Sequence, residues 1–203
     1  MVDHEARLEK DAFDPVFDHL LLIDNQRDAR ALDDVVGVYR LLPGARLGAD
    51  GRFYSEGEYD LTALRASGRR LLELGRSCVH PQYRGGAAMF HLWNGLADYV
   101  ETHRIDILFG TASFHGTDIA KLAAALSYLH FNHLAPESLR VRAIGQDAHP
   151  MALTPPEDVG GFVGDGAYID RAFNTTDVCL VMDTALMSAK HREFYSRKQG
   201  RGV

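Results

Sequence analysis

The stretch LLELGRSCVHPQYRGGAAMFHLW, residues 71–93, constrains the fold more than any other part of the sequence. Gly75 and Arg76 interrupt an apolar run where a regular central strand would continue with β-branched residues, so we expect a bulge near Gly75. Pro81 ends the strand, QYRGG forms a turn, and residues 87–103 have helical apolar spacing. The stretch therefore predicts a bulged strand, a glycine-rich turn and a helix, in that order.

The rest of the pattern predicts a mixed α/β sheet with helices packed on it, in a single domain over residues 1–203. Further strands are expected over residues 18–24, 35–44, 106–114 and 178–184. Helices are expected over residues 60–66 and 118–134, the second beginning at a Thr117/Asp118 cap. Residues 145–166 are rich in Gly, Pro and Asp and predict a long loop. The helix over residues 87–103 carries one apolar stripe, made of Met89, Leu92, Trp93, Leu96, Tyr99 and Val100.

Charge and cysteine content exclude several classes of protein. A net charge of -6 argues against a nucleic-acid partner, because phosphate binding needs a basic face. The N-terminus is charged where a signal peptide would be apolar, and no window reaches the ~20 apolar residues of a membrane span. Cys78 and Cys179 lie in apolar runs and predict reduced core thiols. The histidines have no metal-ligand spacing, so no metal is expected. We expect a cytoplasmic protein.

Residues 190–201 carry five Lys and Arg residues, one His and a single acid. Such a segment favours peripheral contact with an anionic surface, here the inner membrane or an acidic carrier protein. The alternative is a solvated, frayed C-terminal helix.

The glycine-rich turn predicts an anion cradle. Backbone N–H groups at the start of a helix point outward and favour a phosphate, and Arg84 would add a complementary charge. The residues whose N–H groups would form the cradle are Gly85, Gly86, Ala87 and Ala88. Many Gly-Gly turns before a helix bind nothing, so the bulged strand that precedes this one is what favours a site here.

The segment VHPQYRGGAA is similar to the pyrophosphate-binding motif of GNAT acyltransferases, and ELGRSCVHPQYRGG with LWNGLADYV resembles the L-ornithine N(alpha)-acyltransferase family of ornithine-lipid biosynthesis. The resemblance continues through FDPVFDHLLLID, VVGVYRLL, FYSEGEYDL, ASFHG, LSYLHF and IDRAFNTTDVCLVMDT. The Glu-x-x-Arg strand, Glu73 to Arg76, is also similar to that of acyl-homoserine lactone synthases. Relative to the family pattern, this chain lacks an N-terminal strand and helix and a segment near residues 159/160.

The resemblance implies a GNAT fold and a transferase of lipid metabolism. The implied reaction moves a 3-hydroxyacyl group from the phosphopantetheine of acyl carrier protein to the α-amine of L-ornithine, giving lyso-ornithine lipid, with no permanently bound cofactor. Two alternatives remain open at this point. One is another GNAT N-acyltransferase that uses acyl-CoA, and the other is a catalytically silent binding protein.

The implied chemistry assigns roles to residues along the predicted strands. Glu73 would relay a proton or hold the ornithine ammonium, or else form a structural ion pair with Arg76. A backbone N–H freed by the bulge, at Val79 or a neighbour, would polarise the thioester carbonyl. Ser113 and Phe114 would line the pantetheine channel, or simply end their strand.

Three acids near strand and helix ends are candidates for binding a doubly cationic amino acid. They are Asp18, Glu58 and Asp60. For each of them the alternative is a helix cap or a surface charge.

Overall fold

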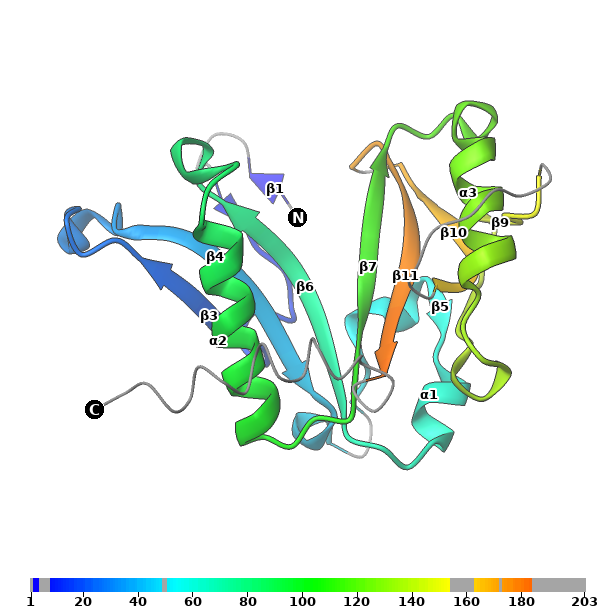
Figure 1. Ribbon diagram of the computed structural model, residues 1–203, viewed down its shortest axis with the longest axis horizontal. Helices are drawn as coiled ribbons and strands as arrows, with labels where there is room; N and C mark the ends of the chain where they lie inside the picture. The colour runs from blue at the N-terminus through cyan, green and yellow to red at the C-terminus, as the bar shows by residue number, and fades with distance from the viewer. Residues whose placement is uncertain (1, 4–7, 49–50, 154–162, 172, 184–203) are drawn as a thin grey trace.

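The computed structural model describes residues 2–3, 8–48, 51–153, 163–171 and 173–183. Its main element is a nine-stranded mixed sheet in the order β3-β4-β6-β7-β11-β10-β8-β5, with β9 paired to β10 (Figure 1). The strands are β3 (Asp18–Ile23), β4 (Val35–Pro43), β5 (Tyr59–Asp60), β6 (Leu71–Val79), β7 (Ile107–His115), β8 (Arg142–Ala143), β9 (Ala148–His149), β10 (Val163–Asp170) and β11 (Thr175–Asp183). The expected mixed sheet is confirmed.

Three α-helices and several 3₁₀ turns connect the strands in the described part of the chain. The helices are α1 (Thr62–Ala66), α2 (Ala88–Thr102) and α3 (Ile119–His133), and the 3₁₀ turn used below is η3 (Tyr54–Gly57). A separate pair of short strands, β1 (Val2–Asp3) and β2 (Leu8–Glu9), lies near the N-terminus. The Asp118 side chain caps α3 by accepting the Ala120 N–H, which confirms the cap expected from the sequence.

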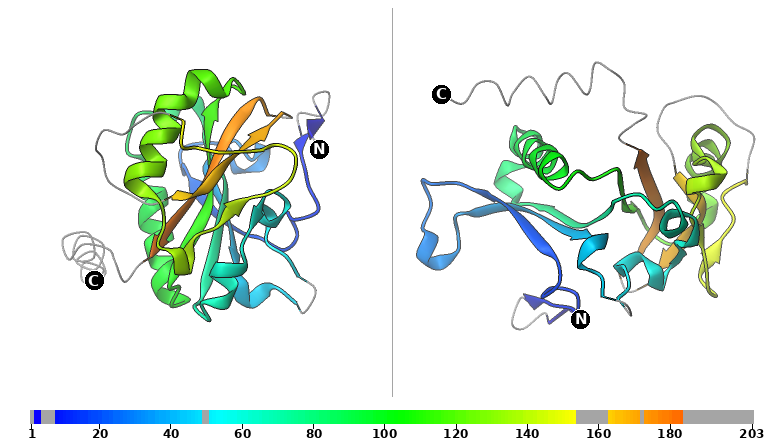
Figure 2. Two further views of the ribbon diagram at one scale, coloured as in Figure 1. Left: turned by 90° about the vertical axis from the view of Figure 1, so that its right-hand side faces the viewer. Right: turned by 90° about the horizontal axis from the view of Figure 1, so that it is seen from below.

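Side-chain alternation along the strands separates two packed faces. On β7, Leu108 packs with Leu96 of α2, and Ala112 packs with Leu126 of α3, so both long helices cover one face. α2 lies over the β3–β4 half of the sheet and α3 over the β10 half (Figure 2). Phe109 points to the opposite face, which is covered by residues 53–64. The site described below is therefore lined by different side chains on the helix-covered face and on the face covered by residues 53–64.

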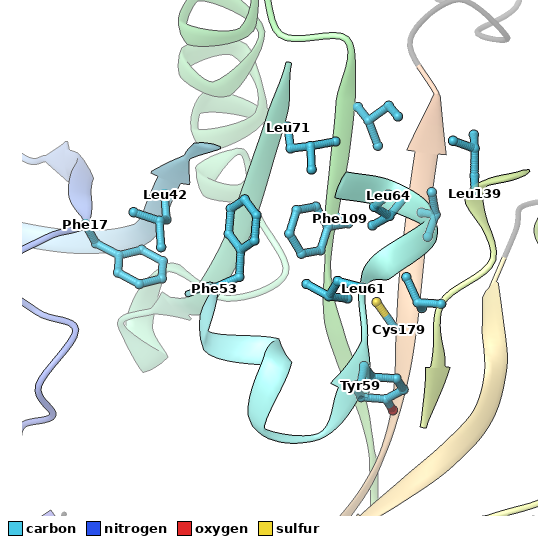
Figure 3. Packing of buried hydrophobic residues seen from close by; sticks show 13 residues of the cluster. Phe17, Leu42, Phe53, Tyr59, Leu61, Leu64, Leu71, Phe109, Leu139 and Cys179 are labelled. Atoms are coloured by element: carbon cyan, nitrogen blue, oxygen red, sulfur yellow. The ribbon is translucent and has the colours of Figure 1, made fainter. Parts of the chain in front are cut away.

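The opposite face holds the larger apolar cluster, which is shown in Figure 3. Phe53 meets Phe109 edge to face, with ring centroids 4.9 Å apart, and Cys179 is fully buried beside them. The expected buried thiol is thus confirmed for Cys179. The same expectation is wrong for Cys78. Its side chain is exposed because the bulge in β6 changes the alternation of the residues that follow.

The predicted bulge is confirmed, and its strained residue is Arg76. Arg40 of β4 lies opposite Gly75 and Val38 lies opposite Cys78, so two residues of β6 face one residue of β4. Arg76 has a φ of 49°, a left-handed conformation that is uncommon for a non-glycine residue. The bulge turns the Arg76 side chain toward the cleft described below.

Two further expectations fail within the described residues. The predicted loop over residues 145–166 contains β9 and the start of β10, whose glycines obscure the strand pattern. Gly164 is required there because a Cβ atom would collide with the side chain of Val141, the residue before β8. Met89, placed on the buried stripe of α2, is 39% exposed, since it lies in the first turn beyond the edge of the sheet.

Residues 190–201 and the junction near residues 159/160 lie outside the described residues. Within the part that is described, no helix combines the length and the apolar character needed to cross a bilayer.

We expect Gly110→Ala to destabilise the fold. Gly110 lies where β7 leaves β6, and a Cβ atom at this position would overlap the backbone carbonyl of Leu74. Overpacking against backbone costs about 1–3 kcal/mol of unfolding free energy. Chemical denaturation measures the loss. Gly75→Ala is the matched control on the neighbouring strand, because its Cβ would meet open space, and an equal effect of the two substitutions would contradict this account.

Candidate active site

A cleft opens between β6 and β7 where their pairing ends. The two strands run parallel and pair only from Leu71–Ile107 to Glu73–Phe109, and they then diverge toward the top of Figure 1. Residues 74–77 of β6 and 110–113 of β7 line a cavity of about 600 Å³ between them. Beyond Glu73 the facing strand edges have no ladder partner, so their backbone groups are left for a ligand.

The cleft has an apolar wall on the helix-covered face and an acidic wall on the other. The apolar wall consists of Tyr39, Leu74, Trp93, Leu108, Leu180 and Met182. Leu180 and Met182 are 45% and 41% exposed, although they lie on β11, a central strand of the sheet. The acidic wall consists of Glu58, Glu73, Asp170 and Asp177. One side thus suits an apolar chain and the other a cation.

Glu73 is buried and is held by the backbone of η3 rather than by Arg76. Its Oε2 accepts the Tyr54 N–H and its Oε1 the Ser55 N–H, both at 2.7 Å, and the Ser55 hydroxyl also donates to Oε1. Burial raises the pKa of Glu73, while the hydrogen bonds from Ser55 and Tyr54 act in the opposite direction. The alternative of a Glu73–Arg76 ion pair is therefore wrong, because both carboxylate oxygens bond to the turn across the cleft.

Glu58 and Asp177 form the second part of the acidic wall. Asp177 is 6% exposed, and its Oδ1 and the Glu58 Oε2 have no hydrogen-bond partner among the described residues. Burial raises the pKa of Glu58 to about 7, and the nearby carboxylates of Asp177, Asp170 and Glu73 add to the shift. Burial likewise raises the pKa of Asp177, against the hydroxyls of Ser113 and Thr175.

Two arginines line the same cavity. Arg40 is buried and bonds to Asp11 and Asp14, at 2.9 and 2.5 Å, so its charge is neutralised by the N-terminal segment. Arg76 reaches Asp11 at 3.4 Å, and its guanidinium lies over the Tyr54 and Phe173 rings, 5.8 and 5.1 Å from their centroids. Arg76 is thus the cation best placed to meet an anionic group in the cleft.

The glycine-rich turn lies beyond the end of β6, where the sequence places the cradle. Gly85 has a φ of 75°, which only glycine adopts easily, and α2 begins at Ala88 with Ala87 as its N-cap residue. The turn residues do not line the cavity, but they follow directly from the strand that does. The Arg84 Nε donates to the Val79 carbonyl at 3.0 Å, which fixes this side chain against the strand end.

Three other predicted site residues occupy different positions relative to the cleft. Val79 packs against Leu92 of α2 and is absent from the cavity lining, whereas Ser77, next to the bulge, lines it. Ser113 also lines it, opposite Asp177 in the β7–β11 register. Phe114 points to the other face, where it packs under α3.

Of the three candidate substrate acids, the structure brings only Glu58 to the cleft. Asp18, the first residue of β3, accepts a hydrogen bond from the Tyr99 hydroxyl at 2.7 Å and pairs with Arg46 at 2.5 Å. Asp60 is exposed and accepts the Thr62 N–H at 2.9 Å, just before α1. Both positions agree with the structural alternatives considered for them.

The sequence did not single out Ser55, Asp170 or Asp177. A signal for Asp177 was present, because it alternates with Cys179 and Val181 on the buried face of β11, where an acid is unusual. Within the described residues, no group of three or more His, Cys, Asp or Glu side chains is arranged to hold a metal ion.

Comparison with known proteins finds relatives in one enzyme family. Residues 2–94 match the family described as "Acetyltransferase (GNAT) domain", which supports the expected GNAT fold. The chain is 58% identical over its whole length to the L-ornithine N(alpha)-acyltransferase of Rhodobacter capsulatus, of which it covers 85%. It is 37% identical to the enzyme of the same name from Brucella abortus, with 96% of this chain and 77% of that protein covered.

Among solved structures, a CoA-dependent acyl-homoserine lactone synthase superposes at a TM-score of 0.46 with 14% identity, covering 100% of this chain and 74% of that one. Sequence identity to the two enzymes above is far higher and extends over most of their length. The chain therefore belongs to the L-ornithine N(alpha)-acyltransferase family.

Proposed function

We propose that this protein transfers a 3-hydroxyacyl group from a phosphopantetheine thioester to the α-amine of L-ornithine, giving lyso-ornithine lipid. The observation that carries the proposal is the cleft between β6 and β7, with an acidic wall on one face and an apolar wall on the other. An amino acid with two ammonium groups fits the acidic wall, and an acyl chain fits the apolar one. Family membership supports the same reaction.

The reaction joins the α-nitrogen to the thioester carbonyl carbon and breaks the carbon–sulfur bond. The amine must be neutral to attack, so it loses a proton, and the leaving thiolate gains one. The carbonyl oxygen becomes negative in the transition state and needs N–H donors. We assign the donors to the β6 edge beside the bulge, where Ser77 lines the cavity, and Val79 stays the alternative two residues further along.

The donor side of the proposal uses the glycine-rich turn. The N–H groups of Gly85, Gly86, Ala87 and Ala88 precede or begin α2, where they lack intrahelical partners and suit a phosphate. Arg84 would add a charge-assisted contact. Ser113 is close enough to the cavity to guide the pantetheine arm, and Phe114 would act only through packing. The proposed donor is acyl carrier protein, and peripheral contact with the inner membrane would place the product.

Acyl transfer by the purified chain tests the reaction and the donor together. With L-ornithine as acceptor, we expect lyso-ornithine lipid, detected by mass spectrometry, when the donor is 3-hydroxyacyl carrier protein. The matched donor is the 3-hydroxyacyl-CoA of the same chain length. Faster transfer from the CoA thioester would support a CoA-dependent N-acyltransferase instead. If the folded protein transfers the acyl group from neither thioester, the result would support the alternative of a catalytically silent binding protein.

Glu73→Gln separates catalysis from support of η3. A glutamine amide would place an NH₂ group against one of the backbone N–H donors of Tyr54 and Ser55, so we expect the unfolding free energy to fall by about 1–3 kcal/mol. If Glu73 also relays the amine proton, kcat should fall by about 10²–10⁴-fold in the protein that remains folded.

Two readouts on the same purified variant decide the role of Glu73. An increase confined to the ornithine KM would indicate recognition alone, since binding without proton transfer leaves kcat unchanged. Normal kinetics together with lowered stability would restrict Glu73 to holding the turn.

The raised pKa of Glu58 gives a pH-dependent stability. Its folded-state pKa of about 7 lies above the value of 4.5 for an ordinary glutamate, so the folded protein holds this proton more tightly. The stabilisation that this proton gives to the folded state is complete below pH 4.5, and it is lost as the pH rises through 7. Glu58→Gln should therefore become more stable relative to the parent protein as the pH rises.

Melting temperatures of the two proteins between about pH 5 and pH 8 test this dependence. Glu137→Gln, on an exposed turn, is the control and should follow the parent at every pH. Parallel curves for Glu58→Gln and the parent would contradict an elevated pKa at Glu58.

A further inference from the structure

We propose that Asp177 and Glu58 bind the side-chain δ-ammonium of L-ornithine and thereby select a diamino acid over amino acids without a second cation. The inference rests on the proposed function, and it adds a specificity site that lies apart from Glu73. It is built on a buried carboxylate, Asp177, and a half-buried one, Glu58, which share one cavity and each have an oxygen without a hydrogen-bond partner among the described residues.

Asp177 is the principal element of this site. Its side chain is 94% removed from solvent, it lines the cavity, and its Oδ1 has no hydrogen bond within the described structure. Leaving a buried carboxylate oxygen unpaired costs free energy unless a ligand or a proton satisfies it. Natural proteins seldom retain such an oxygen without a functional reason.

Glu58 is fixed beside Asp177 by the backbone around it. The hydroxyl of the next residue, Tyr59, donates to the Asp177 carbonyl at 2.7 Å, and the Glu58 carbonyl accepts the Ile144 N–H at 2.9 Å. Asp177 is the strongest of the charged neighbours that raise the Glu58 pKa. Two carboxylates held this close repel each other when both are ionised, and a bound ammonium would relieve the repulsion.

Asp177 lies at a different level of the cleft from Glu73. Glu73 is in register with Phe109 of β7, and Asp177 with Ser113, which is about 13 Å further along at the usual strand rise. Both Glu73 oxygens already accept hydrogen bonds from η3. This separation is between backbone positions, and the side chains extend from them into one cavity, so the two nitrogens of ornithine, at the ends of a four-carbon chain, would contact different acids of the wall.

An ammonium suits this pair better than a neutral group does. It donates three hydrogen bonds and brings a positive charge to the two acids, and Arg40 is already neutralised by Asp11 and Asp14. A neutral side chain would leave one oxygen of each carboxylate without a partner, which is the strongest basis for rejecting a substrate that lacks the group. The pair would therefore act mainly on substrate choice.

The test compares L-ornithine with L-norvaline, which has the same carbon chain and no δ-amine. Steady-state kinetics and calorimetric binding are measured for the parent protein, Asp177→Asn and the control Asp98→Asn, an exposed acid on α2. We expect Asp177→Asn to raise the ornithine KM by about ten- to hundredfold, the loss of one charge-assisted contact. Norvaline turnover should not fall and should improve, because the substitution removes one of the charges that reject a neutral side chain, and Asp98→Asn should match the parent.

Each other outcome bears on a different proposal. Equal losses for both amino acids, or unchanged ornithine KM in folded Asp177→Asn, would overturn the δ-ammonium site. If Asp177→Asn does not fold, Glu58→Gln is measured in the same way and must show the same selective loss. Selective binding of ornithine by the parent without any acyl transfer would support this site while refuting the proposed reaction.

Discussion

The short parallel pairing of β6 with β7 is the constraint on which the site depends. Three residue pairs join the strands, and Gly110 then approaches the Leu74 carbonyl too closely for any side chain. Each strand keeps its other neighbour, β4 for β6 and β11 for β7, so the sheet stays continuous below the cleft while its centre opens. A cavity in the middle of a sheet exposes unpaired backbone, and such backbone is useful where a polar ligand must be held by N–H and C=O groups.

The alternation of side chains along the strands gives the cleft its two chemical sides. Consecutive residues of β11 point to opposite faces, so Asp177 belongs to the acidic wall, and Leu180, three positions later, to the apolar wall. A diamino acid and an acyl thioester can therefore approach the same strand edges from opposite faces. The amide bond proposed here would form where the two walls meet.

The acidic wall reduces stability in the absence of a ligand. Burial and mutual repulsion disfavour the ionised forms of Glu58 and Asp177, whereas Glu73 is compensated by the N–H groups of η3. This difference separates a carboxylate that supports the fold from carboxylates that are left to pair with a substrate. Unpaired buried acids of this kind are typical of binding sites rather than of structural ion pairs.

The sequence by itself determined the features that depend on neighbouring residues. The bulge at Gly75 and Arg76, the turn into α2 and the Asp118 cap follow from local periodicity and backbone preference, and all are present. Family resemblance likewise indicated the reaction class. Only the tertiary structure decided three other features: the partner of Glu73, the exposure of Cys78 and the proximity of Asp177 to Glu58. They depend on where one strand ladder ends and which distant segment covers each face, and local patterns do not encode such long-range contacts.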